Sequence, residues 1–96
     1  MWRAMQQTEA MLEIDPSTLG TLEVDGFWVP YLDLYDVDFL PTRLKMVNDE
    51  YAFKNSVPRS GHGAILPQEL RELRAEGKRA IIVEREDRYY VFVSPP

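Results

Sequence analysis

The chain contains no cysteine and only one histidine, His62. Without cysteine it can form neither disulfides nor thiolate metal sites. No apolar run approaches the roughly 20 residues that a membrane-spanning helix needs, and residues 1–7 are too polar for the apolar core of a signal peptide. These absences predict a protein of a reducing compartment, the cytoplasm, with no membrane association and no cofactor.

The composition is that of a soluble globular protein. Of the 96 residues, 45% are hydrophobic and 28% are charged, which excludes a disordered chain. The length predicts a single domain over residues 1–96, because two independent cores need more chain. A domain this small buries only part of its unfolded surface, so a homodimer is a natural source of further stability.

Charge is distributed unevenly between the two halves of the chain. Residues 1–50 carry three basic and ten acidic side chains, a net charge of −7, and include several aromatic residues. Residues 51–96 carry eight basic and six acidic side chains, a net charge of +2. Such asymmetry indicates either two surfaces with different partners or two halves that pair with each other.

Three segments predict β-hairpins, because each has a polar pair between runs rich in strand-forming residues. The segments are 20–31, 43–55 and 80–93, with turns at Asp25-Gly26, Asn48-Asp49 and Glu86-Asp87. The turn positions predict which residues face each other across each hairpin. The expected pairs are Val24 with Phe27 and Leu22 with Val29, then Leu44 with Phe53 and Met46 with Tyr51, then Ile81 with Phe92, Val83 with Tyr90 and Ile82 with Val91.

Two helices complete the predicted fold. Residues 67–76 have a proline at the start, an apolar stripe of Leu70 and Leu73, and Gly77 at the end, where a glycine cap belongs. Residues 2–14 have a weaker helical spacing and predict a short N-terminal helix. Asp15 is expected to begin a turn or a brief helical start. The fold class is therefore a strand-rich α+β domain with three hairpins and one clear helix.

Candidate sites for chemistry are few. A lone histidine between glycines could act as a base or ligand, but His62 has no partner that spacing identifies, and an exposed loop residue is the stronger reading. Asp33, Asp36 and Asp38 lack the glycine and the distant glutamate of a calcium loop. Neither a nucleophile elbow nor a phosphate loop is present. We therefore expect no enzyme and no metal site.

The acidic cluster has a second interpretation, since it is interleaved with aromatic residues. Exposed carboxylates beside tyrosine and tryptophan are typical of protein-binding surfaces. The alternative is a solvated edge whose aromatic residues belong to the core. The candidate protein-binding residues are Trp28, Tyr31, Asp33, Tyr35, Asp36 and Asp38.

Residues 51–94 resemble the AbrB-type (SpoVT/AbrB) swapped-hairpin DNA-binding domains. The matching run is Ser60-Gly61-His62-Gly63-Ala64-Ile65-Leu66-Pro67-Gln68-Glu69-Leu70-Arg71, which follows that family's order of glycine turn, short apolar strand and Leu-Pro-x-Glu-Leu-Arg helix. A terminal hairpin after Gly77 also falls in the family's place. Positions that are often basic in the family hold His62 and Glu72 here.

The resemblance implies an intertwined homodimer that binds double-stranded DNA as a transcriptional regulator. Some relatives in the family act as antitoxins, so an antitoxin-like regulator is included in this expectation. By motif, Gly61 matches the turn glycine and Arg71 the helix arginine, while Lys54 and Arg59 lie on the matching first strand. The candidate DNA-binding residues are Lys54, Arg59, His62, Arg71 and Arg74.

Two hypotheses follow. The first is a small dimeric DNA-binding regulator. It requires Lys54, Arg59 and Arg71 to converge on a face free of carboxylates, because affinity for DNA grows with the phosphates neutralised. The second is an acidic protein-binding module, such as a phage-type inhibitor, that binds a basic surface of a host protein or mimics DNA. It requires one continuous acidic surface, for which the candidates are Glu23, Asp25, Asp33, Asp36 and Asp38. A metal-dependent enzyme would require His62 beside the aspartates.

Overall fold

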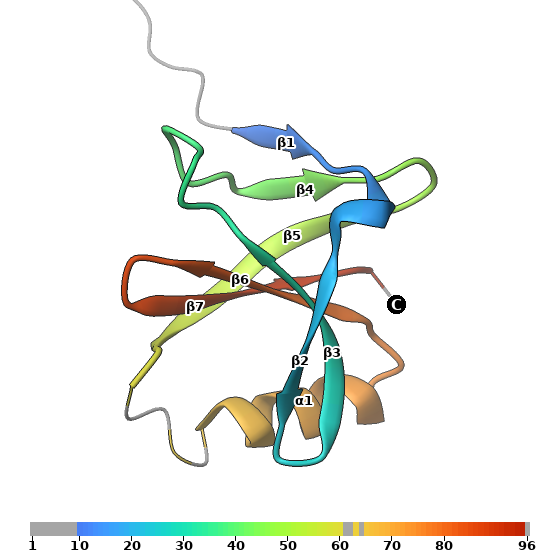
Figure 1. The fold of residues 1–96 in the computed structure, drawn as a ribbon. Coiled ribbons are helices and arrows are strands. Elements are labelled where there is room, and N and C mark those ends of the chain that lie inside the picture. The colour runs from blue at the N-terminus through green and yellow to red at the C-terminus, as the bar shows by residue number, and fades with distance from the viewer. Residues whose placement is uncertain (1–9, 61–62, 64, 96) are drawn as a thin grey trace, which may run out of the picture.

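The protein is a strand-rich α+β structure in which seven strands form one open, mixed sheet (Figure 1). This computed structural model describes residues 10–60, 63 and 65–95. The strand order is β1-β4-β5-β7-β6-β3-β2, so β1 and β2 are the two edges. The elements are β1 (Met11–Glu13), a 3-10 helix (Pro16–Thr18), β2 (Gly20–Val24), β3 (Phe27–Asp33), β4 (Arg43–Lys45), β5 (Glu50–Pro58), α1 (Ile65–Ala75), β6 (Ala80–Arg85) and β7 (Arg88–Val93).

Two of the antiparallel pairs have the registers expected from their turns. In the β2–β3 pair, Val24 lies opposite Phe27 and Leu22 opposite Val29. The turn between them has φ of 51° at Asp25 and 87° at Gly26, the left-handed backbone that a two-residue hairpin turn requires. The β6–β7 pair likewise joins Ile81 to Phe92, Ile82 to Val91 and Val83 to Tyr90.

The register predicted for the β4–β5 pair is wrong by two residues. Leu44 lies opposite Tyr51, not Phe53. The reason is the position of the turn, because Met46 and Asp49 exchange backbone hydrogen bonds of 2.8 and 3.3 Å. The turn therefore centres on residues 47–48, one residue earlier than the polar pair suggests. Since the shift is even, Leu44 still faces the same side of the sheet.

The helix predicted over residues 2–14 is also wrong where the structure describes it. Met11–Glu13 is a strand that runs parallel to β4, with Met11 opposite Arg43; the remainder of that prediction lies outside the described residues. Asp15 does begin a short helical turn. Its Oδ1 accepts a hydrogen bond of 3.0 Å from the Ser17 N–H and caps the 3-10 helix.

Helix α1 begins at Ile65, two residues before the proline that was expected to start it. Proline is tolerated there because the first N–H groups of a helix have no intrahelical partner. Gly77 has φ of 74°, its N–H donates to Arg74 O and the Lys78 N–H donates to Leu73 O. This is the glycine-capped helix end that the sequence predicts.

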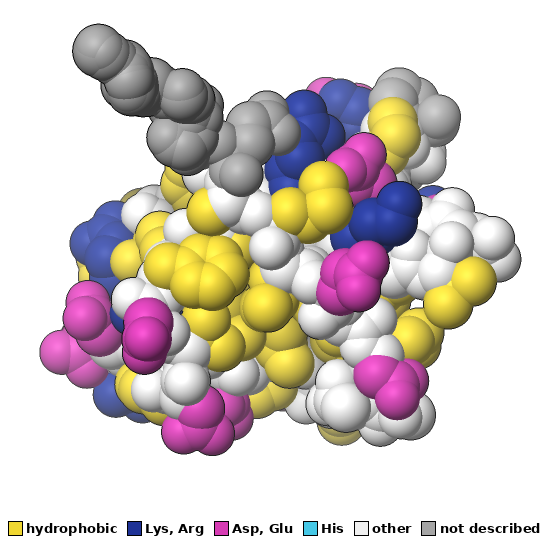
Figure 2. All heavy atoms as spheres, turned by 90° about the horizontal axis from the view of Figure 1, so that it is seen from above, with side chains coloured by type: hydrophobic (Ala, Val, Ile, Leu, Met, Phe, Trp, Pro, Cys, Tyr) yellow, Lys and Arg dark blue, Asp and Glu magenta, His cyan; other side chains and the backbone are white. Residues whose placement is uncertain are grey.

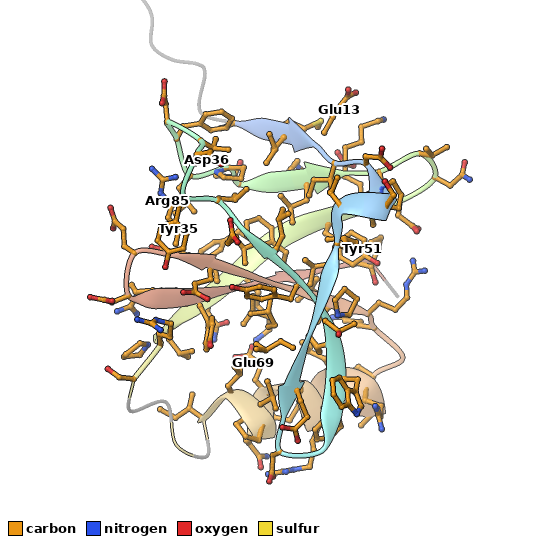
Figure 3. The ribbon with its side chains drawn as sticks, viewed as in Figure 1. Glu13, Tyr35, Asp36, Tyr51, Glu69 and Arg85 are labelled. Carbon is orange, nitrogen blue, oxygen red and sulfur yellow. The ribbon has the colours of Figure 1, made fainter. Side chains whose placement is uncertain are left out.

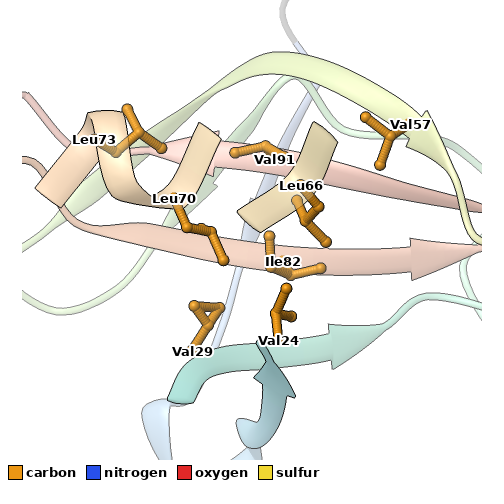
Figure 4. Packing of buried hydrophobic residues seen from close by; sticks show 8 residues of the cluster. All are labelled: Val24, Val29, Val57, Leu66, Leu70, Leu73, Ile82 and Val91. Carbon is orange, nitrogen blue, oxygen red and sulfur yellow. The ribbon is translucent and has the colours of Figure 1, made fainter. Parts of the chain in front are cut away.

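The sheet is apolar on both faces, and each face has its own core. Because side chains alternate along a strand, Ile82 and Val91 face α1, whereas Ile81 and Phe92 face the opposite side. Figure 4 shows the helix-side cluster, with Leu66, Leu70 and Leu73 packed on the sheet and on the β2–β3 pair. The second cluster consists of Ile14, Leu34, Leu44, Tyr51, Ile81, Val83 and Phe92.

Candidate protein-binding surface

Lys54, a candidate DNA-binding residue, is engaged with a buried carboxylate. It lies at the irregularity between Phe53 and Asn55 in β5, and its Nζ donates to Glu69 of α1. The Glu69 side chain is only 8% exposed and also accepts a 2.7 Å hydrogen bond from Asn55 Nδ2. The hydrogen bond to Glu69 raises the pKa of Lys54. This cation therefore holds α1 to β5.

The other described candidates for DNA binding also have partners. Arg71 and Arg74 contact the β2–β3 pair on one flank of α1, whereas Lys54 is on the other flank. These side chains therefore do not form the single carboxylate-free face that the DNA-binding hypothesis requires. His62 lies outside the described residues. The contacts are Arg59 with Glu84 and Asp87 (both 3.5 Å), Arg71 with Asp25 (3.6 Å), and Arg74 over the Phe27 ring (4.6 Å from its centroid).

The loop after β3 carries a different kind of charge. We call residues 33–40 the acidic loop. Its three carboxylates, Asp33, Asp36 and Asp38, are exposed, and none forms an ion pair with another described residue. Tyr35, in the same loop, is 54% exposed. With respect to the described residues, the acidic loop thus presents unneutralised charge beside an accessible aromatic ring.

The backbone of the acidic loop is held in place by β6 and the turn after it. Leu34 is buried, and its N–H donates a 3.0 Å hydrogen bond to Glu84 O. Arg85 Nη1 donates to Leu34 O (2.8 Å) and Val37 O (2.5 Å). Figure 3 shows Tyr35, Asp36 and Arg85 together at this end of the sheet. Because its backbone is fixed, the loop can bind a partner with little further loss of entropy.

An exposed apolar patch adjoins the acidic loop. Phe39 and Leu40 are exposed at the end of the loop. Met11 of β1 is exposed as well, and the 2.8 Å hydrogen bond from Thr42 N–H to Ala10 O joins the two segments. Figure 2 shows apolar side chains gathered near the middle of this side of the molecule, with both acidic and basic side chains around them. An apolar centre with a charged rim is the usual anatomy of a protein interface.

Glu84 anchors the aromatic part of this surface. It accepts a 2.5 Å hydrogen bond from the Tyr31 hydroxyl, and the Tyr35 hydroxyl lies 2.7 Å from its Oε2. Hydrogen bonding from Tyr31, aided by Tyr35 and the charge of Arg59, lowers the pKa of the Glu84 carboxyl. Burial and the Glu84 carboxylate raise the pKa of Tyr31. A carboxylate held in its charged form by two tyrosine hydroxyls and a neighbouring guanidinium positions side chains and is a poor general base.

This arrangement predicts how stability depends on acid. Since folding lowers the pKa of Glu84, its contribution to the free energy of unfolding is fully present above the ordinary glutamate pKa of 4.5 and is lost as pH falls through the folded pKa. The melting temperature of Glu84→Gln is expected to lie below that of the unsubstituted protein at neutral pH, with the gap closing in acid. Tyr35→Phe, which removes one donor, should show a smaller gap. A gap that stays constant throughout the acid range would contradict this role of Glu84.

The structure therefore brings together five of the six predicted protein-binding residues. Tyr31, Asp33, Tyr35, Asp36 and Asp38 lie at the end of the sheet where β3 and β6 finish. Trp28, 70% exposed, lies at the start of β3 beside a groove that Arg74, Lys78 and Arg79 also line. Asp25 and Glu23 are likewise at that far end, so the acidic surface is not continuous along β3.

Sequence reasoning missed Glu84 and Arg85, the residues that hold the acidic loop. The available signal was their position, because two charged residues follow directly on the apolar run Ile81-Ile82-Val83 of a predicted strand. Charged side chains at that place need partners from another segment. Nothing local in the sequence identified the loop after β3 as that segment.

The part of the chain described by the structure offers no group of three His, Asp or Glu side chains that could hold a metal ion. None of the helices it describes has the length and apolarity to cross a membrane. No family model, curated protein or solved structure matches the chain.

Proposed function

We propose that this protein is a small interaction module that binds a basic surface of a partner protein through the acidic loop. The observation that carries the proposal is that the candidate cations are paired, whereas the carboxylates of the acidic loop are not paired with any described residue. The candidate cations Lys54, Arg59 and Arg71 already have carboxylate partners, whereas the carboxylates of the acidic loop are exposed and unpaired by any described residue.

The chemistry of such binding follows from the neighbouring residues. Unpaired surface carboxylates steer a basic partner toward the loop and fix its orientation. Tyr35, Phe39 and Met11 supply apolar contact area, which carries most of the energy once water is excluded. Because Glu84 and Arg85 already order the loop, little affinity is lost in ordering it on binding.

The test is a comparison of two triple variants that change net charge equally. D33N/D36N/D38N removes the charges of the acidic loop. E13Q/E72Q/E76Q removes three exposed carboxylates elsewhere. Both variants and the unsubstituted protein are immobilised, and captured proteins from the source cells are quantified by mass spectrometry. We expect a partner with a basic surface whose apparent affinity falls about tenfold or more with the first variant only.

The proposal also requires that capture weaken with added salt, since the interaction is between exposed charges. The control triple variant should retain the partner at all salt concentrations where the unsubstituted protein does. If every captured protein responds equally to both triple variants, the acidic loop is not the binding surface.

DNA binding is the second candidate, and one observation favours it. The succession β5, α1, β6 and β7, with Gly77 ending the helix, follows part of the element order of the AbrB-type domains that residues 51–94 resemble. It departs from that order at Ile65 and Leu66, which begin α1 where the family has a short apolar strand. Binding would require phosphates to displace Glu69, Glu84 and Asp25 from their cations. A salt titration with mixed duplex DNA decides between the candidates. We expect no binding at low salt; binding that weakens steeply with salt, and further in R59A/R71A, would replace the proposal with a DNA-binding regulator.

A further inference from the structure

The open edge of the sheet at β2 has hydrogen-bonding groups that the described chain does not use. β2 pairs with β3 on one side and is the last strand of the sheet on the other. Val24 and Phe27 flank the two-residue turn, so they form a hydrogen-bonded pair, as do Leu22 and Val29. The N–H and C=O groups of Thr21 and Glu23 consequently point away from β3. Pro30 lies opposite Thr21. Its position is consistent with this alternation, because proline has no N–H and Thr21 and Pro30 form a non-hydrogen-bonded pair.

Within the described residues, the β2 edge lacks most of the usual protections against strand pairing. Its five residues, Gly-Thr-Leu-Glu-Val, include no proline and no lysine, and its register with β3 is continuous, without a bulge. Its only charge is Glu23. That carboxylate accepts a 2.6 Å hydrogen bond from the Gly26 N–H and is thereby drawn toward the turn, leaving the edge accessible.

We propose that a second copy of the chain pairs with this edge, β2 antiparallel to β2, about a two-fold axis at Leu22. In that register Thr21 faces Glu23 of the second copy, and the two exchange both backbone hydrogen bonds. The symmetry repeats the exchange on the other side of the axis. All the outward-pointing N–H and C=O groups of Thr21 and Glu23 are then satisfied, and the two sheets become one.

Charge favours the register with its two-fold axis at Leu22 over the register with its axis one residue further on, at Glu23. An axis at Glu23 would place the two Glu23 carboxylates directly opposite each other, which is destabilising. With the axis at Leu22, each Glu23 faces a threonine. The edge therefore accepts a second copy of its own sequence, in reverse direction, without opposing like charges.

Apolar packing supports the same register. Leu22 is half-buried and packs against the helix-side core beside Val29. In the proposed pair the two Leu22 residues form a non-hydrogen-bonded pair, in which side chains lie closest. A row of Val29, Leu22, Leu22 and Val29 then joins the two helix-side cores. On the other face, Trp28 lies next to Glu23 in the register, so its exposed ring borders the new interface.

The test is the mass of the protein in solution, measured by light scattering and sedimentation over a range of concentrations. We expect a monomer–dimer equilibrium for the unsubstituted protein and for Thr21→Ser, which keeps the N–H. Thr21→Pro removes one donor from each copy at an edge position that tolerates proline. Its dimer dissociation constant is expected to rise roughly 30-fold or more.

Hydrogen exchange of the unsubstituted protein provides the second measurement, which stands even if Thr21→Pro fails to fold. The amides of Thr21 and Glu23 should gain protection as concentration rises through the dimerisation range. A protein that stays monomeric at all concentrations would overturn the proposal. So would a dimer that survives Thr21→Pro, particles larger than two chains, or Thr21 and Glu23 amides that exchange freely in the dimer. None of these results depends on the acidic loop.

Discussion

Replacing Phe92 with alanine is expected to lower the free energy of unfolding by about 3–5 kcal/mol. Phe92 is 0% exposed and lies in β7, between β5 and β6. It packs in the core on the sheet face opposite α1, with Leu44 and Val83 among its neighbours in that cluster. Removing the ring leaves a cavity that three hydrogen-bonded strands cannot close. Since small domains are stable by only about 5–15 kcal/mol, this loss should be visible at once in urea denaturation followed by circular dichroism.

Phe53→Ala is the matched control for this prediction. Phe53 lies opposite Phe92 in the β5–β7 register, and the two rings meet edge to face with centroids 5.8 Å apart. Phe53 is 41% exposed, however. Its removal is expected to cost only about 1 kcal/mol, the size of an aromatic pair. Equal losses for the two variants would show that the core on this face is not centred on Phe92.

Replacing Glu69 with alanine is expected to lower the free energy of unfolding by about 2–3 kcal/mol. The Glu69 carboxylate receives hydrogen bonds from Lys54 and from Asn55 Nδ2. Asn55 Oδ1 is already buried with no hydrogen-bond partner among the described residues, and Asn55 would also lose the hydrogen bond that its Nδ2 donates to Glu69. Lys54 is half-exposed and can turn to water, which keeps the loss below that of a fully buried pair. Thermal and urea unfolding of the purified variant measure the effect.

Two variants isolate the cause of this loss. Glu72→Ala removes an exposed carboxylate one turn further along α1, and its effect is expected to stay within about 0.5 kcal/mol. Glu69→Gln keeps an oxygen that can accept from Asn55, so its loss should fall between those of the two alanine variants. If Glu69→Ala and Glu72→Ala are equally stable, the Lys54–Glu69–Asn55 contact does not hold α1 to β5.

Local turn chemistry explains which parts of the fold could be predicted from the sequence. Asp25-Gly26 provides a two-residue turn that sets the β2–β3 register, and Gly77 ends α1, because both depend only on residues close in the chain. The β4–β5 register was missed because Val47, an apolar residue, occupies the turn and lies 81% exposed. The strand Met11–Glu13 was missed because its partner, β4, is distant in sequence.

For the candidate surface, the exposure of the acidic residues could be predicted from the sequence, whereas the partners of the cations could not. The spacing of Asp33, Asp36 and Asp38 among aromatic residues indicated an exposed acidic segment, and these residues are exposed in the structure. The spacing of the cations could not reveal that Lys54 meets Glu69 or that Arg71 meets Asp25. These pairs join separate elements, so only the fold identifies them.

The two-sided core has a consequence for how the β6–β7 pair chooses its alignment. In most sheets a one-residue slip would turn apolar side chains to water, and that penalty enforces correct pairing. Here both faces of β6 and β7 are covered, so hydrophobicity scarcely distinguishes the native pairing from a slipped one. The distinction must come from side-chain shape and from the turn at Glu86-Asp87, where Glu86 adopts φ of 58° without being glycine. Together with side-chain shape, a short exposed turn thus determines which of the two cores receives each buried side chain.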